Sequence, residues 1–112
     1  MTNTPHHALY LSFTELLESN YQKHHSVQFY AEELCVGLNT LNICCKENAG
    51  MTPLNVINNR VFKEAQRMLL FTELRSGEIS TLLGFPEQAN FVNFFKKYAK
   101  MSPTKYRETN RK

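Results

Sequence analysis

Residues 84–107 of the chain read GFPEQANFVNFFKKYAKMSPTKYR. The glycine and proline at the start of this stretch are typical of a tight turn. A helix is expected from near Glu87, because the apolar residues after it recur at helical spacing: Phe91, Phe94, Phe95 and Tyr98. Just upstream, apolar positions within residues 79–83 predict a short amphipathic helix. Two helices joined by a turn of three or four residues predict a helix-turn-helix.

The same pattern occurs earlier in the chain. Residues 45–53, CKENAGMTP, align with residues 95–103, FKKYAKMSP, at an offset of 50. The identical pairs are Lys46/Lys96, Ala49/Ala99, Met51/Met101 and Pro53/Pro103. Farther upstream the offset is shorter by one, so that Ala31 pairs with Ser80. A repeat seen only twice indicates a duplicated supersecondary unit, because a solenoid needs three or more copies.

The first copy predicts a helix from Val27 to Leu34 with Ser26 as its N-cap, and a second helix from about Leu38 to Asn48 that ends at Gly50. The packed face of the second helix is expected to carry Leu38, Leu41, Cys44 and Cys45. Cys35 takes the place that Gly84 has in the second turn. A residue other than glycine at positive φ costs about 1 kcal/mol, which weakens the first turn.

Between the two copies, residues 53–71 read PLNVINNRVFKEAQRMLLF and predict one long helix from Leu54 to Thr72. Its apolar stripe contains Leu54, Ile57, Val61, Ala65, Met68 and Leu69. Ser76 and Gly77 are expected to end this connection. A helix of 19 residues is about 28 Å long, near the spacing of about 34 Å between successive major-groove faces of B-DNA. The linking helix could therefore present two recognition helices to adjacent turns. The other interpretation is that it is simply the central core helix of an all-α domain, and we expect both to hold.

One further helix is expected at each end of the chain. Apolar residues at Tyr10, Phe13, Leu16, Leu17 and Tyr21 predict the first, and residues 103–107 a short closing helix. The predicted fold is all-α, with two helix-turn-helix units joined by a long central linking helix and about seven helices. We expect one compact bipartite domain, with residues 1–52 as the first part, 53–76 as the linking helix and 77–112 as the second part.

The composition is that of an ordinary globular domain, with 112 residues, 42% apolar and 21% charged. No apolar run approaches the roughly 20 residues that a membrane span needs. The N-terminal sequence has neither a basic leader nor a long apolar stretch, and the number of cysteines, three, is odd. We therefore expect a cytoplasmic protein with reduced thiols and no membrane association.

Catalytic and metal-binding motifs are missing from the sequence. It has no aspartate and only four glycines, so phosphate-binding loops are not expected. The four histidines form two adjacent pairs, His6-His7 and His24-His25, without the spacing of a metal site. We expect no enzymatic activity, no metal and no cofactor. Catalysis by a thiolate at Cys35 or Cys45 is the most distant alternative.

Together these motifs resemble the C-terminal DNA-binding domain of AraC/XylS-family transcription regulators. The resemblance covers residues from about Val27 to Arg107, and its most specific part lies in the second copy. The matching residues there are Gly84-Phe85, Phe91, Phe95-Lys96, Ser102-Pro103 and Tyr106-Arg107, and the linking helix matches at Arg60, Ala65 and Leu69. The departures are Cys35 for a turn glycine, Gly37 for a serine cap, Cys45 for an aromatic residue, Ser80 for alanine and Lys100 for a glycine.

The resemblance implies that the second helix of each unit enters the major groove of double-stranded DNA. The implied contacts in the first unit are Asn39, Thr40, Asn42, Ile43 and Lys46. Those in the second unit are Gln88, Asn90, Asn93, Lys96 and Lys97. Asparagine and glutamine can bond adenine, and many relatives carry arginine where Ile43 and Asn93 stand, so the site is expected to favour A·T pairs. Arg60 and Arg67 could touch phosphate or serve packing.

The resemblance also implies a bacterial transcription regulator, with RNA polymerase as a further partner. The family usually carries an effector-sensing or dimerising domain as well, for which this chain has no room. The alternative is a protein-interaction module that keeps the fold but has lost base-specific reading. Its support is the non-consensus first turn and the acidic first half of the chain. The net charge of +3 is unevenly distributed, with −2 over residues 25–50 and +3 over residues 78–107. We expect the second unit to supply most of the phosphate affinity.

Overall fold

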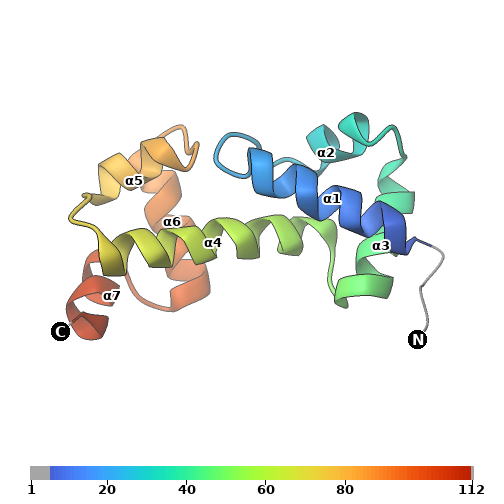
Figure 1. The fold of residues 1–112 in the computed structure, drawn as a ribbon. Coiled ribbons are helices and arrows are strands. Elements are labelled where there is room, and N and C mark those ends of the chain that lie inside the picture. Colours follow the sequence, from blue (N-terminus) through green and yellow to red (C-terminus); the bar gives the residue numbers. More distant parts are fainter. Residues whose placement is uncertain (1–5, 112) are drawn as a thin grey trace. The chain divides into compact units, whose positions relative to one another are not determined.

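The computed structural model describes residues 6–111, which form seven α-helices and no β-strand (Figure 1). The helices are α1 (His7–Asn20), α2 (Val27–Glu33), α3 (Leu38–Ala49), α4 (Pro53–Phe71), α5 (Ser76–Leu82), α6 (Gln88–Ala99) and α7 (Pro103–Asn110). The prediction of an all-α fold with two helix-turn-helix units and a long linking helix, α4, is confirmed.

The duplication read from the sequence is present in the helices themselves. Helices α3 and α6 are both 12 residues long and begin 50 positions apart. Helices α2 and α5 both have seven residues and begin 49 positions apart. The turns close in the same way, because the Val36 N–H donates to the Ala31 carbonyl and the Phe85 N–H to the Ser80 carbonyl, both at 3.0 Å.

The residues with left-handed backbone also occupy equivalent places. In the two turns these are Cys35, with φ of 57°, and Gly84, with φ of 81°. At the ends of α3 and α6 they are Gly50, with φ of 68°, and Lys100, with φ of 65°. Cys35 and Lys100 therefore hold conformations that favour glycine, as their alignment with Gly84 and Gly50 predicts.

Helices α4 and α7 begin with the same local structure. The Thr52 hydroxyl accepts a hydrogen bond from the Asn55 N–H at 3.2 Å, and the Ser102 hydroxyl accepts one from the Lys105 N–H at 3.1 Å. A proline follows each of these hydroxyl residues and forms the first residue of the helix, where it loses no backbone hydrogen bond. The start of α4 thus corresponds to α7.

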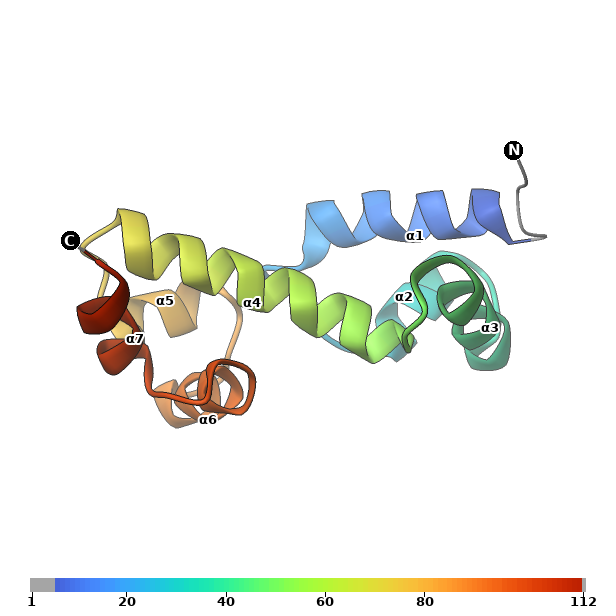
Figure 2. The same cartoon turned by 90° about the horizontal axis from the view of Figure 1, so that it is seen from below.

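The chain divides into two compact units, one up to Arg60 and one from Val61 onward, so the boundary falls within α4. In the first unit α1 packs on both α2 and α3, which lie on the same side of it in Figure 2. The buried core of this unit contains Phe13, Leu17, Tyr21, Tyr30, Ala31, Leu41, Cys44, Cys45 and Ile57. The Phe13 and Tyr30 rings meet edge to face with their centroids 5.6 Å apart.

In the second unit α6 packs against α5 and α7. Its buried core contains Val61, Ala65, Met68, Leu69, Ile79, Leu83, Phe91 and Phe95. From α7, Arg107 caps the end of α4: its Nε donates to the Leu69 carbonyl at 2.9 Å and its Nη2 to the Thr72 carbonyl at 3.0 Å. These carbonyls lack partners within their helix, so the guanidinium satisfies them.

Two local expectations were wrong. Leu38 and Leu54 are about half exposed rather than packed. On α4 the neighbouring Pro53 is buried instead of Leu54, so the buried stripe begins at Pro53 and continues at Ile57. Ser76 and Gly77 do not end the connection but begin α5, since α4 already ends at Phe71. The expectation of Ser26 as the N-cap residue of α2 is confirmed in position, and its hydroxyl makes no capping hydrogen bond.

Candidate nucleic-acid interface

The first candidate surface is the face of α3 opposite its buried side chains. Leu41, Cys44 and Cys45 are buried, which turns the intervening residues outward. The structure places the predicted residues Asn39, Ile43 and Lys46 on the exposed surface and leaves Thr40 and Asn42 half-buried. The polar side chains among these five make no hydrogen bond within residues 6–111, so their donors and acceptors face solvent.

The second candidate surface is the corresponding face of α6. Phe91 and Phe95 are buried, and the predicted residues Gln88, Asn90, Asn93, Lys96 and Lys97 are all exposed. Their side chains likewise make no hydrogen bond in the described part of the chain. Each unit therefore presents one face of a 12-residue helix, in the same register relative to its turn.

The C-terminal end of α3 is held by contacts that the sequence analysis missed. His6 Nδ1 lies 3.1 Å from Glu47 Oε1, and His7 Nδ1 lies 3.3 Å from Asn48 Oδ1. The Cys44 thiol donates to the His6 carbonyl at 3.5 Å. These residues are about 40 positions apart along the chain, so no local periodicity could have indicated the contacts. Together they attach the start of α1 to α3.

The N-terminal end of α6 is positioned by α5. The Ser80 hydroxyl donates to the Glu87 carbonyl at 3.2 Å, which ties α5 to the residue before α6. A Cβ atom added at Gly77 would lie 3.2 Å from Gln88 Oε1, so the Gln88 side chain rests against the glycine. Aromatic rings pack against the buried side of α6. The ring centroids of Phe85 and Phe91 are 5.5 Å apart, and those of Phe62 and Phe95 are 5.1 Å apart.

Positive charge is concentrated in the second unit. The first unit has three Lys and Arg residues against five Glu, a net charge of −2, and the second has ten against five, a net charge of +5. Four lysines around α6 are exposed and form no ion pair within the described range: Lys96, Lys97, Lys100 and Lys105. Lys96 and Lys97 lie on α6 itself, Lys100 is its C-cap residue, and Lys105 lies on α7.

The arginines of the linking helix form ion pairs with glutamates. Arg60 bonds both carboxylate oxygens of Glu18 at 2.8 Å, and its guanidinium lies 4.1 Å from the centre of the Tyr21 ring. Arg67 bonds the carboxylate of Glu64, whose side chain is 9% exposed. Of the two roles left open by the sequence, these contacts favour the structural one.

The two cysteines of α3 belong to the core. Burial raises the pKa of Cys45 to about 12 and, with the charge of Glu47 as a smaller cause, also raises the pKa of Cys44. Both thiols are therefore protonated near neutral pH, which opposes a nucleophilic role for Cys45. Within residues 6–111 no three His, Cys or Glu side chains are grouped so that they could hold a metal ion.

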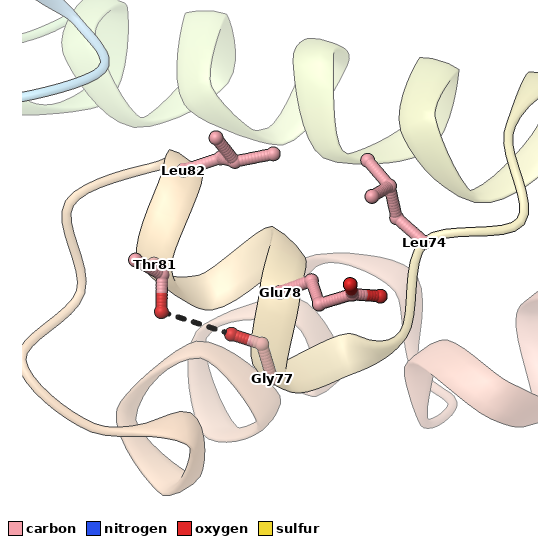
Figure 3. A pocket seen from close by; sticks show the side chains of 5 residues that line it. All are labelled: Leu74, Gly77, Glu78, Thr81 and Leu82. Atoms are coloured by element: carbon pink, nitrogen blue, oxygen red, sulfur yellow. Dashed lines mark hydrogen bonds between the residues drawn. The ribbon is translucent and has the colours of Figure 1, made fainter.

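An open hollow of about 390 Å³ lies on α5 and the segment before it (Figure 3). It is lined by Leu74, Gly77, Glu78, Thr81 and Leu82. The Thr81 hydroxyl donates to the Gly77 carbonyl at 3.1 Å, and the Glu78 carboxylate accepts from the Arg75 N–H at 2.8 Å. Both polar side chains thus serve the helix itself. No residue of α6 lines the hollow, although Gly77, one of its lining residues, lies against the Gln88 side chain.

Comparison with known families assigns the fold. Residues 30–109 match a family described as "Helix-turn-helix domain", which is of the AraC type. The chain belongs to the AraC/XylS family of transcription regulators. It is a DNA-binding domain of transcription regulation, as its two helix-turn-helix units and its resemblance to the family predict. No helix within residues 6–111 is long and apolar enough to cross a membrane.

A curated relative and several solved structures agree with membership in the AraC/XylS family. The chain is 26% identical over 93 residues to the lactose operon transcription activator of Staphylococcus xylosus, a match that covers 83% of this chain and 33% of the relative. The chain thus corresponds to about a third of that protein.

Among solved structures, the C-terminal domain of the response regulator yesN from Fusobacterium nucleatum has a TM-score of 0.83 and 27% identity, covering 89% of this chain and 98% of that one. The C-terminal domain of AraT, a response regulator from Geobacillus stearothermophilus, has a TM-score of 0.83 and 25% identity, and the match covers 90% of this chain and 84% of that one. The DNA-binding domain of AdpA, solved with a target DNA, has 18% identity and a TM-score of 0.80 over 88% and 89% of the two chains, and so shows the shared fold.

Proposed function

We propose that this domain reads a specific double-stranded DNA sequence with the exposed faces of α3 and α6, one in each of two adjacent major grooves. The observation that carries the proposal is that two 12-residue helices of the same register each present an exposed face with amide and lysine side chains. The base-reading residues are Asn39, Thr40, Asn42 and Ile43 in α3 and Gln88, Asn90 and Asn93 in α6, with Lys46, Lys96 and Lys97 nearer phosphate.

The preferred bases follow from the side chains on these faces. Neither α3 nor α6 contains arginine, the side chain that most often bonds guanine in two places. Asparagine and glutamine pair instead with the N6 and N7 atoms of adenine, and each helix exposes such amides. The operator is therefore expected to be rich in A·T pairs, and selection of a G·C-rich motif would contradict this preference.

The charge distribution supports a division of labour. The unit with a net charge of +5 carries the unpaired lysines beside α6, and phosphate contacts of this kind supply most sequence-independent affinity. The first unit, with a net charge of −2, gains less from phosphate and is expected to contribute selectivity.

The wider role follows from the family and from the length of the curated relative. Since the chain corresponds to about a third of that relative, we expect an effector-sensing or dimerising domain to act together with this one. RNA polymerase is the expected protein partner, and the cytoplasm is the expected compartment. We expect no catalytic activity from the domain, in keeping with a family of DNA-binding regulators.

Equilibrium binding tests the proposal. A duplex selected by the domain from a random pool should bind at least a thousandfold more tightly than random duplex at physiological salt, the lower end of specificity for such proteins. The affinity for both duplexes should fall steeply as salt is raised. Equal affinity for selected and random duplexes, or binding that salt does not weaken, would contradict sequence-specific reading.

A further inference from the structure

The exposed faces of α3 and α6 carry apolar and amide side chains in exchanged positions. At the offset of 50, the aliphatic Leu38 and Ile43 of α3 correspond to Gln88 and Asn93 of α6. Conversely, the amides Asn39 and Asn42 correspond to Ala89 and Val92. At four equivalent positions one helix thus has an amide where the other has an apolar side chain.

Ile43 is the most informative of these residues. Its side chain is 39% exposed, although the other aliphatic residue in the middle of α3, Leu41, is completely buried. Asn39 precedes it by four positions and Lys46 follows it by three, and residues at these spacings are neighbours on a helix surface. A β-branched hydrocarbon therefore lies between an amide and an ammonium group in the middle of the exposed face.

An apolar side chain in the major groove can make a favourable contact with one group on the base edges. The C5 methyl of thymine is the apolar group there, whereas adenine presents the N7 acceptor and the N6 donor that an amide can bond. An aliphatic residue on the reading face therefore points to thymine, and an amide at the equivalent place of the other helix points to adenine.

From this exchange we propose that Ile43 reads the thymine methyl in the half of the operator contacted by α3, and that Asn93 reads adenine at the equivalent place of the half contacted by α6. The proposal rests on the proposed function, that is, on α3 and α6 as the reading helices.

Replacement of thymine by deoxyuridine tests the proposal, since it removes the methyl and keeps the base pair. Each thymine of the selected duplex is replaced singly, and the affinity is measured for the wild type and for Ile43→Asn, Ile43→Val and Leu11→Asn. With the wild type, at least one replacement should lower affinity about fourfold, as expected for one lost methyl contact. Ile43→Asn should abolish this loss, Ile43→Val should keep it, and Leu11→Asn, a change of a half-exposed leucine on α1, should behave as the wild type.

The reciprocal change gives a second readout. Asn93→Ile should shift the preferred base from adenine to thymine in the half of the operator contacted by α6. Replacement of that thymine by deoxyuridine should then lower the affinity of the variant. The proposal would be overturned if Ile43→Asn kept every loss of affinity that the deoxyuridine replacements cause in the wild type. It would also be overturned if no replacement lowered the affinity of the wild type. Failure of the proposed function is distinguishable from this result, because the wild type would then select no sequence at all.

Discussion

Gly50 and Lys100 adopt the same left-handed conformation at the ends of α3 and α6, with ψ of 19° in both and φ of 68° and 65°. The two residues occupy equivalent places in a duplicated unit, and only one of them is a glycine. A lysine in this conformation crowds its Cβ against the backbone, so the end of α6 bears strain that the end of α3 does not.

Relief of this strain should stabilise the domain. Lys100→Gly is expected to raise the free energy of unfolding by about 1 kcal/mol, measured by urea denaturation. Lys100→Ala, which removes the charge but keeps the Cβ, serves as the control and should give no such gain. Gly50→Ala should lower the free energy of unfolding by a similar amount, because open space surrounds that position and only the backbone conformation opposes a Cβ. Equal stabilities of the Gly and Ala variants at position 100 would refute the explanation.

The contact between Gly77 and Gln88 predicts a separation of stability from specificity. In Gly77→Ala, helix propensity should raise the free energy of unfolding by about 0.5–1 kcal/mol. The new Cβ would at the same time lie 3.2 Å from Gln88 Oε1, so the Gln88 amide must move. The base preference at the operator position that Gln88 contacts should therefore change. Binding-site selection with Gly77→Ala, Gln88→Ala and the double variant measures this. If Gly77→Ala also changes the base preference when Gln88 is already alanine, the role of the contact between Gly77 and Gln88 is contradicted.

Alkaline pH should destabilise the domain through Cys45. Burial raises the pKa of its thiol from 9.0 to about 12 in the folded state. In the unfolded state the thiol ionises first, so the stability present below about pH 9 is lost as pH rises toward 12. Urea denaturation from pH 8 to pH 10.5 under reducing conditions should show this decline, and Cys45→Ala should make it shallower. Burial also raises the pKa of Tyr30 to about 12. Tyr30 is therefore expected to cause part of the decline in stability that persists in Cys45→Ala. Parallel pH curves for wild type and variant would rule out Cys45 as a cause.

The lysines of α6 should dominate the salt dependence of DNA binding. Each phosphate contact contributes about 0.9 to the slope of log affinity against log salt, so Lys96→Gln with Lys97→Gln should reduce the slope by about 1.8. Lys46→Gln on α3 is the matched single change, with an expected reduction of at most about 0.9. Unchanged affinity and slope in the α6 double variant would show that the basic unit does not supply the phosphate contacts.

Much of the fold could be predicted because the chain repeats its own pattern. The offset of 50 identified α3 and α6 with matching ends, and the alignment with Gly84 identified Cys35 as the residue at positive φ in the first turn. Apolar periodicity located α1 to α6 but overestimated burial at Leu38 and Leu54, and the closing helix α7 was expected from Pro103, Tyr106 and Arg107. Periodicity describes an infinite helix, whereas packing depends on where each helix begins relative to its neighbours.

The contacts that hold the candidate site were beyond sequence reasoning. The pairs of His6 with Glu47 and His7 with Asn48 join residues 41 positions apart, and Arg107 caps carbonyls more than 30 positions away. Such pairs depend on the tertiary arrangement within a unit and leave no periodic signal. The exchange of amide and apolar residues between α3 and α6 is legible in the sequence, but the exposure of Ile43 that gives it meaning comes from the structure.

Selection of bound duplexes from a random pool tests the central claim, that both helices read bases, most directly. The wild type, Asn42→Ala and Asn93→Ala are selected in parallel, and the preferred base at each operator position is compared. The account predicts that each variant loses preference at its own positions, and that the two sets lie about one helical turn, roughly 10 base pairs, apart. Loss of preference at the same positions in both variants, or no loss in one of them, would contradict reading by both α3 and α6.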